Sequence, residues 1–161
     1  MEVYLGKPSQ ETDITLVTAT TNTSQPVLLY DGLCGFCSKA VQRVLHFEKQ
    51  KTMLFAALQS DYGKSILALH PELEGIDSMV FVESLVDASK GRVFVRSDAV
   101  LQVARYLGGV WNLAVAAYII PRSIRDYLYD QFAKRRYRWF GKLNACMVPS
   151  PEVRARFLDL Q

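Results

Sequence analysis

Residues 27–38 constrain the fold more than any other part of the chain, because they predict a strand, a loop and the start of a helix in immediate succession. The apolar and aromatic run Val27 to Tyr30 fits a short buried strand. Asp31 and Gly32 end that run, and apolar residues then recur at helical spacing from Ala40 to Phe47. The segment therefore predicts an α/β domain in which a loop connects its first strand to its first helix.

Two cysteines, Cys34 and Cys37, occupy this loop and the first helical turn. Unpaired N–H groups and the positive end of a helix dipole stabilise a thiolate there, and two thiols at this spacing can close a disulfide. A redox-active dithiol is the leading interpretation. We expect Cys34 to be the more exposed, attacking thiol and Cys37 to face the core as the resolving thiol. Asp31 is either a turn former or a carboxylate that carries protons and tunes thiol acidity.

Two other classes of function remain open for the same cysteines. Structural zinc normally needs four ligands, and the remaining candidates, Cys146, His46 and His70, are scattered along the chain. A metal-binding module is thus an alternative, although we expect no metal. A non-catalytic interaction domain is another alternative. Cys146 is either a spare thiol or one that exchanges with the pair.

Cysteine usage and hydropathy also bear on the compartment. Three cysteines in 161 residues do not make a disulfide framework, and the N-terminus lacks a basic region before an apolar stretch. We therefore expect a cytoplasmic protein. The longest apolar segment, Val110 to Ile120, is interrupted by Asn112 and is too short for a membrane span, so it predicts a buried helix.

The segment 121–142 concentrates positive charge, with seven Lys or Arg and two Asp or Glu, a net charge of +5 against +3 for the whole chain. A solvated helix face is the ordinary explanation. Interleaved aromatic residues would also suit nucleic acid or an anionic membrane, but Asp126 and Asp130 dilute the patch. We expect neither as a partner.

The remaining pattern predicts further strands and helices. Ser97 is the expected N-cap of one helix, and Gly108-Gly109 should end it. A brief strand is expected at 14–17 within a flexible arm. The predicted strands are 27–30, 53–58, 79–82 and 92–96. The first predicted helix begins at the cysteine loop and ends at about residue 50. The other predicted helices are 62–69, 98–107, 110–120, 121–140 and a short one at the end of the chain.

Several separated motifs resemble the DCC family of thiol-disulfide oxidoreductases, whose signature is Asp-x-x-Cys-x-x-Cys. The signature matches Tyr30-Asp31-Gly32-x-Cys34-x-x-Cys37, and the similarity continues in three later segments. Those are Phe55-Ala56-Ala57-Leu58-Gln59-Ser60, Ser97-Asp98-Ala99-Val100-Leu101, and Ile120-Pro121-Arg122 with the Arg/Tyr-rich helix that follows.

The resemblance implies a thioredoxin-like mixed sheet flanked by helices, with a C-terminal helical extension. It implies a dithiol at Cys34 and Cys37, with Asp31 beside it, that acts on protein or small-molecule disulfides. Such a cycle needs an external thiol reductant and no cofactor. One departure is that Asp77-Ser78, not a proline, precede the third strand.

The chain should therefore divide into three parts. Residues 1–26 form an N-terminal arm, 27–109 a thioredoxin-like core, and 110–161 a helical extension packed on the core.

Overall fold

The computed structural model describes residues 25–73, 76, 78–84, 92–142 and 150–159. The strand expected at 14–17 and Cys146 lie outside these residues. The elements, in chain order, are β1 (Val27–Tyr30), α1 (Gly35–Phe47), β2 (Leu54–Ala57), α2 (Asp61–Leu69), η2 (Pro71–Leu73), β3 (Val80–Val82), β4 (Val93–Val95), α3 (Arg96–Leu107), η3 (Gly109–Ile119), α4 (Arg122–Phe140) and α5 (Pro151–Arg154).

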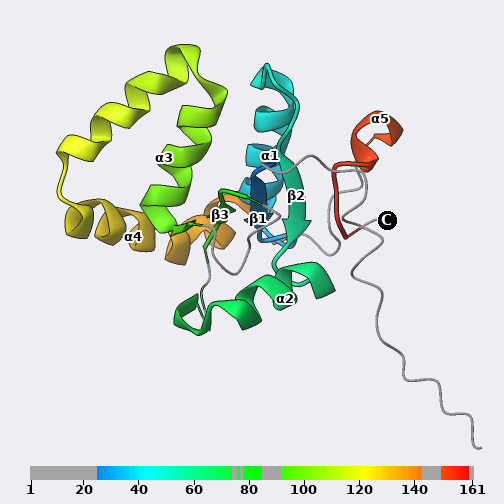
Figure 1. The fold of residues 1–161 in the computed structure, drawn as a ribbon. Coiled ribbons are helices and arrows are strands. Elements are labelled where there is room, and N and C mark those ends of the chain that lie inside the picture. Colours follow the sequence, from blue (N-terminus) through cyan, green and yellow to red (C-terminus); the bar gives the residue numbers. More distant parts are fainter. Residues whose placement is uncertain (1–24, 74–75, 77, 85–91, 143–149, 160–161) are drawn as a thin grey trace, which may run out of the picture.

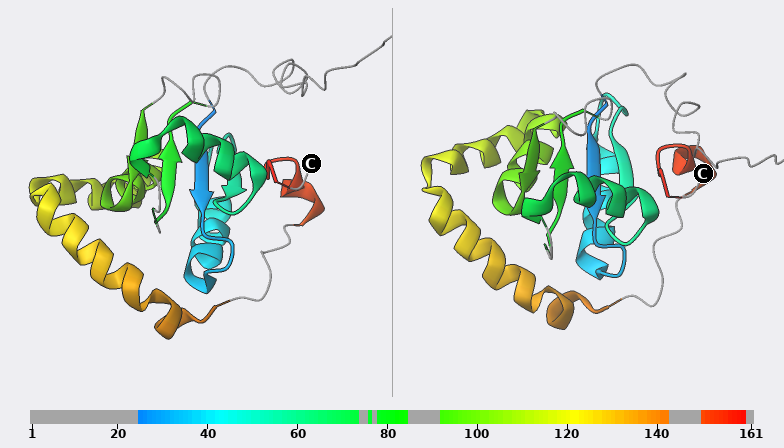
Figure 2. Two further views of the ribbon diagram at one scale, coloured as in Figure 1. Left: turned by 90° about the horizontal axis from the view of Figure 1, so that it is seen from below. Right: turned by 60° about the horizontal axis from the view of Figure 1, so that its bottom comes forward.

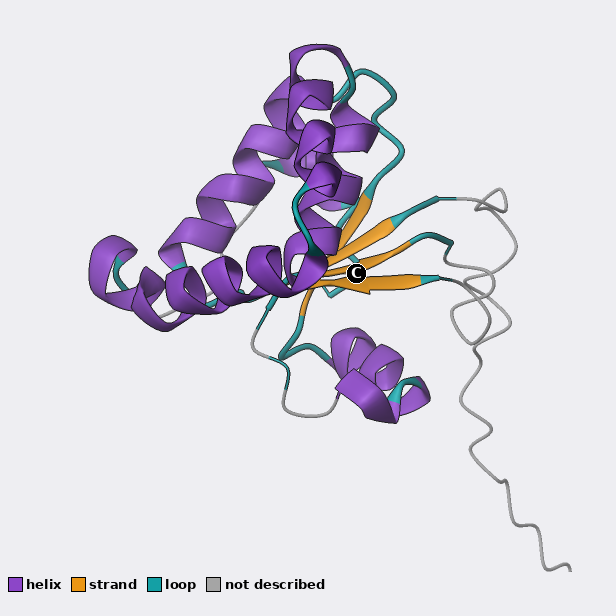
Figure 3. Cartoon of the chain, turned by 90° about the vertical axis from the view of Figure 1, so that its left-hand side faces the viewer, coloured by secondary structure: helices purple, strands orange, loops and turns teal. Residues whose placement is uncertain are grey.

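The four strands form one mixed sheet in the order β2-β1-β3-β4. β1 runs parallel to β2 and antiparallel to β3, and β3 and β4 form an antiparallel pair. In Figures 1 and 3, α2 lies on one face of this sheet, and α1 and α3 lie on the other. This α/β arrangement is thioredoxin-like, as the resemblance implied.

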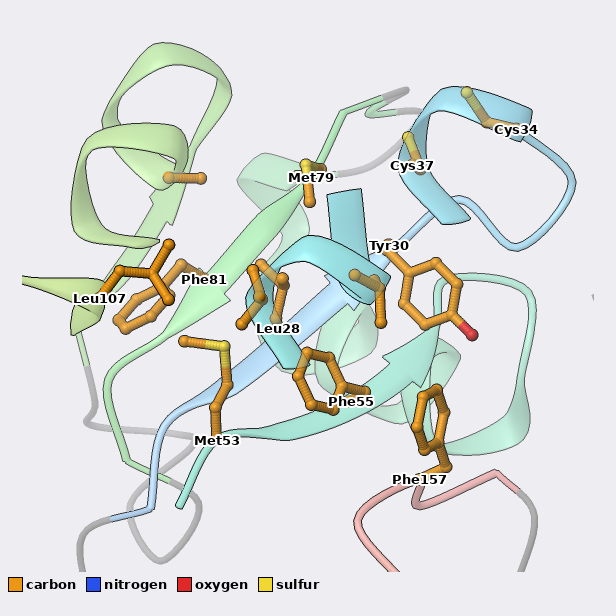
Figure 4. Close-up of a cluster of buried hydrophobic side chains, with 13 residues drawn as sticks. Leu28, Tyr30, Cys34, Cys37, Met53, Phe55, Met79, Phe81, Leu107 and Phe157 are labelled. Atoms are coloured by element: carbon orange, nitrogen blue, oxygen red, sulfur yellow. The ribbon is translucent and has the colours of Figure 1, made fainter. Parts of the chain in front are cut away.

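Each face of the sheet has its own apolar core, because successive side chains of a strand point to opposite faces. Leu28 and Tyr30 pack under α1 and α3 with the cluster shown in Figure 4, which also contains both cysteines. Val27 and Leu29 pack on the other face with Ile66 of α2. Burial on both faces explains why the strands are continuous apolar runs.

The C-terminal segment closes the outer edge of β2. Phe157 is fully buried, and its ring stacks on Phe55 with centroids 5.3 Å apart. The Phe55 N–H donates to the Arg156 carbonyl, and the Leu158 N–H donates to the Phe55 carbonyl. Arg156 also makes an ion pair with the buried carboxylate of Glu48. The chain end is therefore attached to the sheet by both packing and backbone hydrogen bonds.

Two predictions about the helices are wrong. Ser97 does not cap α3, which begins at Arg96 after Val95, because the Ser97 hydroxyl donates to Asp126 of α4. The apolar run after Gly108 is a 3₁₀ helix, η3, and none of its residues is buried. It packs along α3, and the Trp111 ring also contacts Phe47 of α1, with ring centroids 5.5 Å apart. Figure 2 shows η3 and α4 meeting at a corner that projects from the sheet.

None of the helices in the described part of the chain is both long and apolar enough to cross a membrane.

Candidate functional site

The two cysteines lie where β1 leads into α1, as predicted. Cys34 is the N-cap residue of α1, with φ −89° and ψ 117°, and Cys37 lies in the first turn. Both thiols are free and buried, and they lie close enough for the charge of Cys34 to raise the pKa of Cys37. The expected exposure of Cys34 is wrong, because Cys34 is 0 % exposed and Cys37 is 3 % exposed. Figure 4 shows both at the end of α1, above the buried cluster.

Cys34 is covered by the chain that follows α4. Cys34 and Lys142 form an isolated antiparallel bridge, and the Gly35 N–H donates to the Gly141 carbonyl at 3.4 Å. A Cβ atom on Gly35 would lie 2.5 Å from the Phe140 carbonyl oxygen. Only glycine allows this close approach of two backbones, so the sequence of the CxxC loop and the cover over Cys34 depend on each other.

Asp31, directly before the cysteine loop, is buried and accepts four hydrogen bonds. One carboxylate oxygen accepts from the Leu33 N–H at 3.0 Å and from the Gln59 amide at 2.9 Å. The other accepts from the Arg136 guanidinium at 3.0 Å and from the Tyr137 hydroxyl. Asp31 thus forms both the turn contact and a buried ion pair with α4.

The surroundings of Asp31 set its ionisation. Burial raises the pKa of the Asp31 carboxyl, but the Tyr137 hydroxyl, the Leu33 N–H, the Gln59 amide and the Arg136 charge outweigh it and leave the pKa below its ordinary value. The hydrogen bond between Asp31 and Tyr137 has the opposite effect on the tyrosine. Burial and this bond raise the pKa of the Tyr137 hydroxyl to about 12. Asp31 is therefore ionised, and Tyr137 keeps its proton, at neutral pH.

The thiol of Cys37 is held in its protonated form. Burial is the largest cause, and the charge of Cys34 and the hydrogen bond to it add to the effect, so that the pKa of Cys37 rises to about 12. Arg136 lowers this pKa and Asp31 raises it. The ion pair between Arg136 and Asp31 thus brings two opposed charges within electrostatic range of the dithiol.

The segment before β3 also reaches the site. The Met79 N–H donates to the Tyr129 hydroxyl of α4 at 3.2 Å, next to the buried Ser78. Burial raises the pKa of Tyr129, and the charge of Cys37 adds to the shift. This side of the dithiol, where the sequence lacks the proline expected of a thioredoxin-like protein, is thus held by a tyrosine of the extension.

Sequence reasoning missed Arg136, Tyr137 and Gln59. The charge pattern of this helix predicts a solvated basic face, yet Arg136 is 2 % exposed. A usable signal was its spacing, since Tyr129, Phe132 and Arg136 recur at helical intervals and therefore share one face of α4. Phe132 packs against Phe36 of the cysteine motif, with ring centroids 4.7 Å apart.

The two candidate histidines do not join the cysteines. His46 contacts Phe47, and His70 lies 3.1 Å from Glu72. Within the described ranges, no three His, Cys, Asp or Glu side chains are grouped so that they could hold a metal ion.

The fold and the site together define a thioredoxin-like α/β protein with a paired dithiol at the start of its first helix. Comparison with known proteins makes this specific: residues 28–142 match the model of the DCC1-like thiol-disulfide oxidoreductase family, and the chain belongs to that family. The resemblance found in the sequence is confirmed.

Two relatives show how far the similarity extends. The chain is 41 % identical over 133 residues to "Uncharacterized protein YuxK" of Bacillus subtilis (strain 168), which covers 82 % of this chain and 93 % of that protein. It is 32 % identical over 124 residues to "DCC family protein At1g52590, chloroplastic" of Arabidopsis thaliana, covering 76 % of this chain and 69 % of the relative. No solved structure matches significantly.

Proposed function

We propose that the protein is a thiol-disulfide oxidoreductase that cycles between a Cys34/Cys37 dithiol and the corresponding disulfide. The observation that carries the proposal is that two free, buried thiols lie together at the start of α1, close enough for the charge of one to affect the ionisation of the other. Two sulfurs so placed exchange intramolecularly, without the entropic cost of bringing two molecules together. Membership of the family supports the same chemistry.

The order of the two thiols follows from their different surroundings. A thiolate is the nucleophile in disulfide exchange, and Cys37 keeps its proton at neutral pH because its pKa is raised to about 12. We therefore assign Cys34, the N-cap residue of α1, as the attacking sulfur. It attacks one substrate sulfur, forms a mixed disulfide and releases the other sulfur as a thiolate.

The second step releases the part of the substrate that is still bound to Cys34. Cys37 loses its proton as its sulfur attacks Cys34, the mixed disulfide breaks, and the Cys34–Cys37 disulfide forms. The substrate disulfide has then gained two electrons and two protons. An external thiol of the cell reduces the protein disulfide again, so the cycle needs no cofactor. We expect the reducing cytoplasm as its location.

Asp31 acts on this cycle through its charge. It raises the pKa of Cys37, and its carboxylate compensates the Arg136 charge beside the dithiol. Removal of that carboxylate would leave a buried cation next to the thiols. We assign Asp31 the role of tuning thiol acidity and of accepting or returning protons. Its four hydrogen bonds also hold the cysteine loop in place.

The proposal is tested by trapping. A Cys37→Ser variant lacks the resolving thiol and should accumulate a mixed disulfide on Cys34 when a disulfide substrate or cell extract is added. A Cys34→Ser variant is the matched control and should accumulate much less. Equal trapping by both variants, or none by either, would remove the case for a dithiol cycle.

A further inference from the structure

An apolar cavity of about 470 Å³ ends at the dithiol. Its walls are formed by α3, η3 and α4. The side chains at the site end and along the walls include Phe36, Cys37, Met79, Leu101, Leu128 and Phe132. A second apolar cavity of about 330 Å³ shares Phe36 and Met79 with the first and continues between α1 and α3 toward η3.

The size of this space fits a small molecule, since ligand sites in proteins are commonly about 300–1,000 Å³. Both sulfurs are almost inaccessible from the outer surface, with Cys34 at 0 % and Cys37 at 3 % exposure. Of the two, Cys37 lines the cavity. The low exposure of both cysteines disfavours a disulfide presented on the surface of a folded protein, whereas a small molecule in the cavity would lie beside Cys37.

The charge of the cavity restricts the ligand further. Two arginines contribute to the wall, and both are compensated: Arg125 lies 2.8 Å from Asp98, and Arg136 lies 3.0 Å from Asp31. The wall is otherwise mostly apolar. A charged substrate would lose its hydration without gaining a free counter-charge, and such transfer is strongly unfavourable. An uncharged, apolar substrate loses little and gains contacts.

On these grounds we propose that the cavity is the substrate site and that its substrates are small, uncharged, apolar disulfides, such as dialkyl disulfides. This deepens the proposed function and rests on it. One substrate sulfur bonds to Cys34 while the other leaves as a thiol, and the attack of Cys37 on Cys34 releases the second thiol. The protein is oxidised to its disulfide as the substrate is reduced to two thiols.

The test compares two disulfides on the reduced full-length chain. Dipropyl disulfide is the apolar probe and oxidised glutathione the charged one. The rate of protein oxidation by each is divided by the rate at which the same disulfide oxidises dithiothreitol, which removes intrinsic reactivity. We expect the normalised rate for dipropyl disulfide to exceed that for oxidised glutathione by more than tenfold.

A matched pair of variants locates the effect. Ala117 lines the cavity and is half-buried, whereas its neighbour Ala116 is exposed on the same helix. Ala117→Trp should fill the cavity and lower the normalised dipropyl disulfide rate at least tenfold, with little change for oxidised glutathione. Ala116→Trp should change neither rate.

The outcomes separate the two claims. Equal normalised rates in the wild-type chain, or a preference for oxidised glutathione, would overturn the assignment of the cavity and leave the dithiol cycle standing. A chain whose dithiol neither disulfide oxidises would overturn the proposed function, and the cavity assignment with it.

Discussion

The sheet core and η3, which forms one side of the projecting corner, are both rich in apolar residues, and they differ completely in exposure. Every residue of β1 is buried, whereas Leu113 and Ile119 of η3 are 79 % and 88 % exposed. The difference shows that an apolar run does not determine its own burial. β1 is covered because elements pack on both faces of the sheet, whereas η3 is packed mainly by α3, with Trp111 also against Phe47 of α1.

The second half of α4 shows the converse, because a charged residue of a basic segment is buried there. Arg136, a charged residue in a strongly basic segment, is one of the most buried side chains described, because α4 ends against the cysteine loop where Asp31 supplies its counter-charge. The extension is thus mostly exposed along η3 and packed against the cysteine loop around Arg136 and Phe132. Its contribution to stability and to the site should lie at that buried end.

The largest effect is expected from removing the whole extension. Truncation after Gly109 deletes both Arg136 and Phe157, leaving Asp31 without its cation and Phe55 without its stacked partner. We expect the truncated chain to lose cooperative thermal unfolding or to aggregate. This also tests the predicted division into a core at 27–109 and a packed extension at 110–161. A truncated chain that unfolds cooperatively at the wild-type temperature would make the extension a separate appendage.

The matching substitution lies at the exposed corner. Replacing Ile119 by Ser alters a side chain that is 88 % exposed, so the free energy of unfolding should change by no more than about 0.5 kcal/mol. A larger loss would mean that the corner is packed after all, and the comparison would fail.

The next largest effect is expected at the buried ion pair. Arg136→Met leaves Asp31 as an uncompensated buried charge, and breaking such a pair costs about 3–5 kcal/mol. Arg138→Met, two residues along the same helix and exposed, is the control and should cost less than about 0.5 kcal/mol. Chemical denaturation of both variants measures the difference. Equal losses would contradict the account of the buried end.

The pH dependence of stability isolates Asp31. Because its pKa is lowered in the folded protein, Asp31 adds stability that is present above its unfolded pKa of about 3.9 and is lost as the pH falls through the folded pKa. The wild type should therefore lose unfolding free energy below about pH 4 more steeply than Asp31→Asn does. Parallel curves for the two proteins would show that the Asp31 carboxyl titrates alike in both states.

Asp31→Asn should also change the chemistry of the thiols. A carboxylate disfavours nearby thiolates, so its removal should shift the pH profile of disulfide exchange toward lower pH. Gln59→Met is the control, since it removes a hydrogen bond to Asp31 but keeps the charge. An unchanged profile in Asp31→Asn would reduce Asp31 to a structural residue.

A smaller effect is expected at the cover over Cys34. Gly35→Ala places a Cβ atom against the Phe140 carbonyl, so the segment 140–142 must shift. We expect faster alkylation of Cys34 in this variant, measured by mass spectrometry of the labelled peptide. Lys39→Ala, at an exposed position of the same helix, should leave the rate unchanged. An unaltered rate in Gly35→Ala would show that this segment does not limit access.

The sequence contained enough information for the elements whose causes are local. The apolar run Val27 to Tyr30, the Asp31-Gly32 break and the helical spacing that follows predicted β1, the loop with Cys34 and Cys37, and α1. The thioredoxin-like topology depended on the family resemblance.

The contacts that could not be predicted join distant parts of the chain. Asp31 and Arg136 are 105 residues apart, and the Ser97 hydroxyl bonds to Asp126 instead of capping α3. In each case a contact with a side chain of α4 outweighed the local conformational preference. The exposure of Cys34 was mispredicted for the same reason, because Gly141 and Lys142 cover it.

The central claim is that Cys34 and Cys37 form one redox pair, and a redox titration tests it most directly. The full-length chain is equilibrated in dithiol/disulfide buffers of graded potential, free thiols are alkylated, and digested peptides are identified by mass spectrometry. We predict a single two-electron transition in which Cys34 and Cys37 lose reactivity together and appear as one linked peptide, while Cys146 remains labelled throughout. Independent oxidation of the two cysteines, or a disulfide from either one to Cys146 or to a second chain, would contradict the claim.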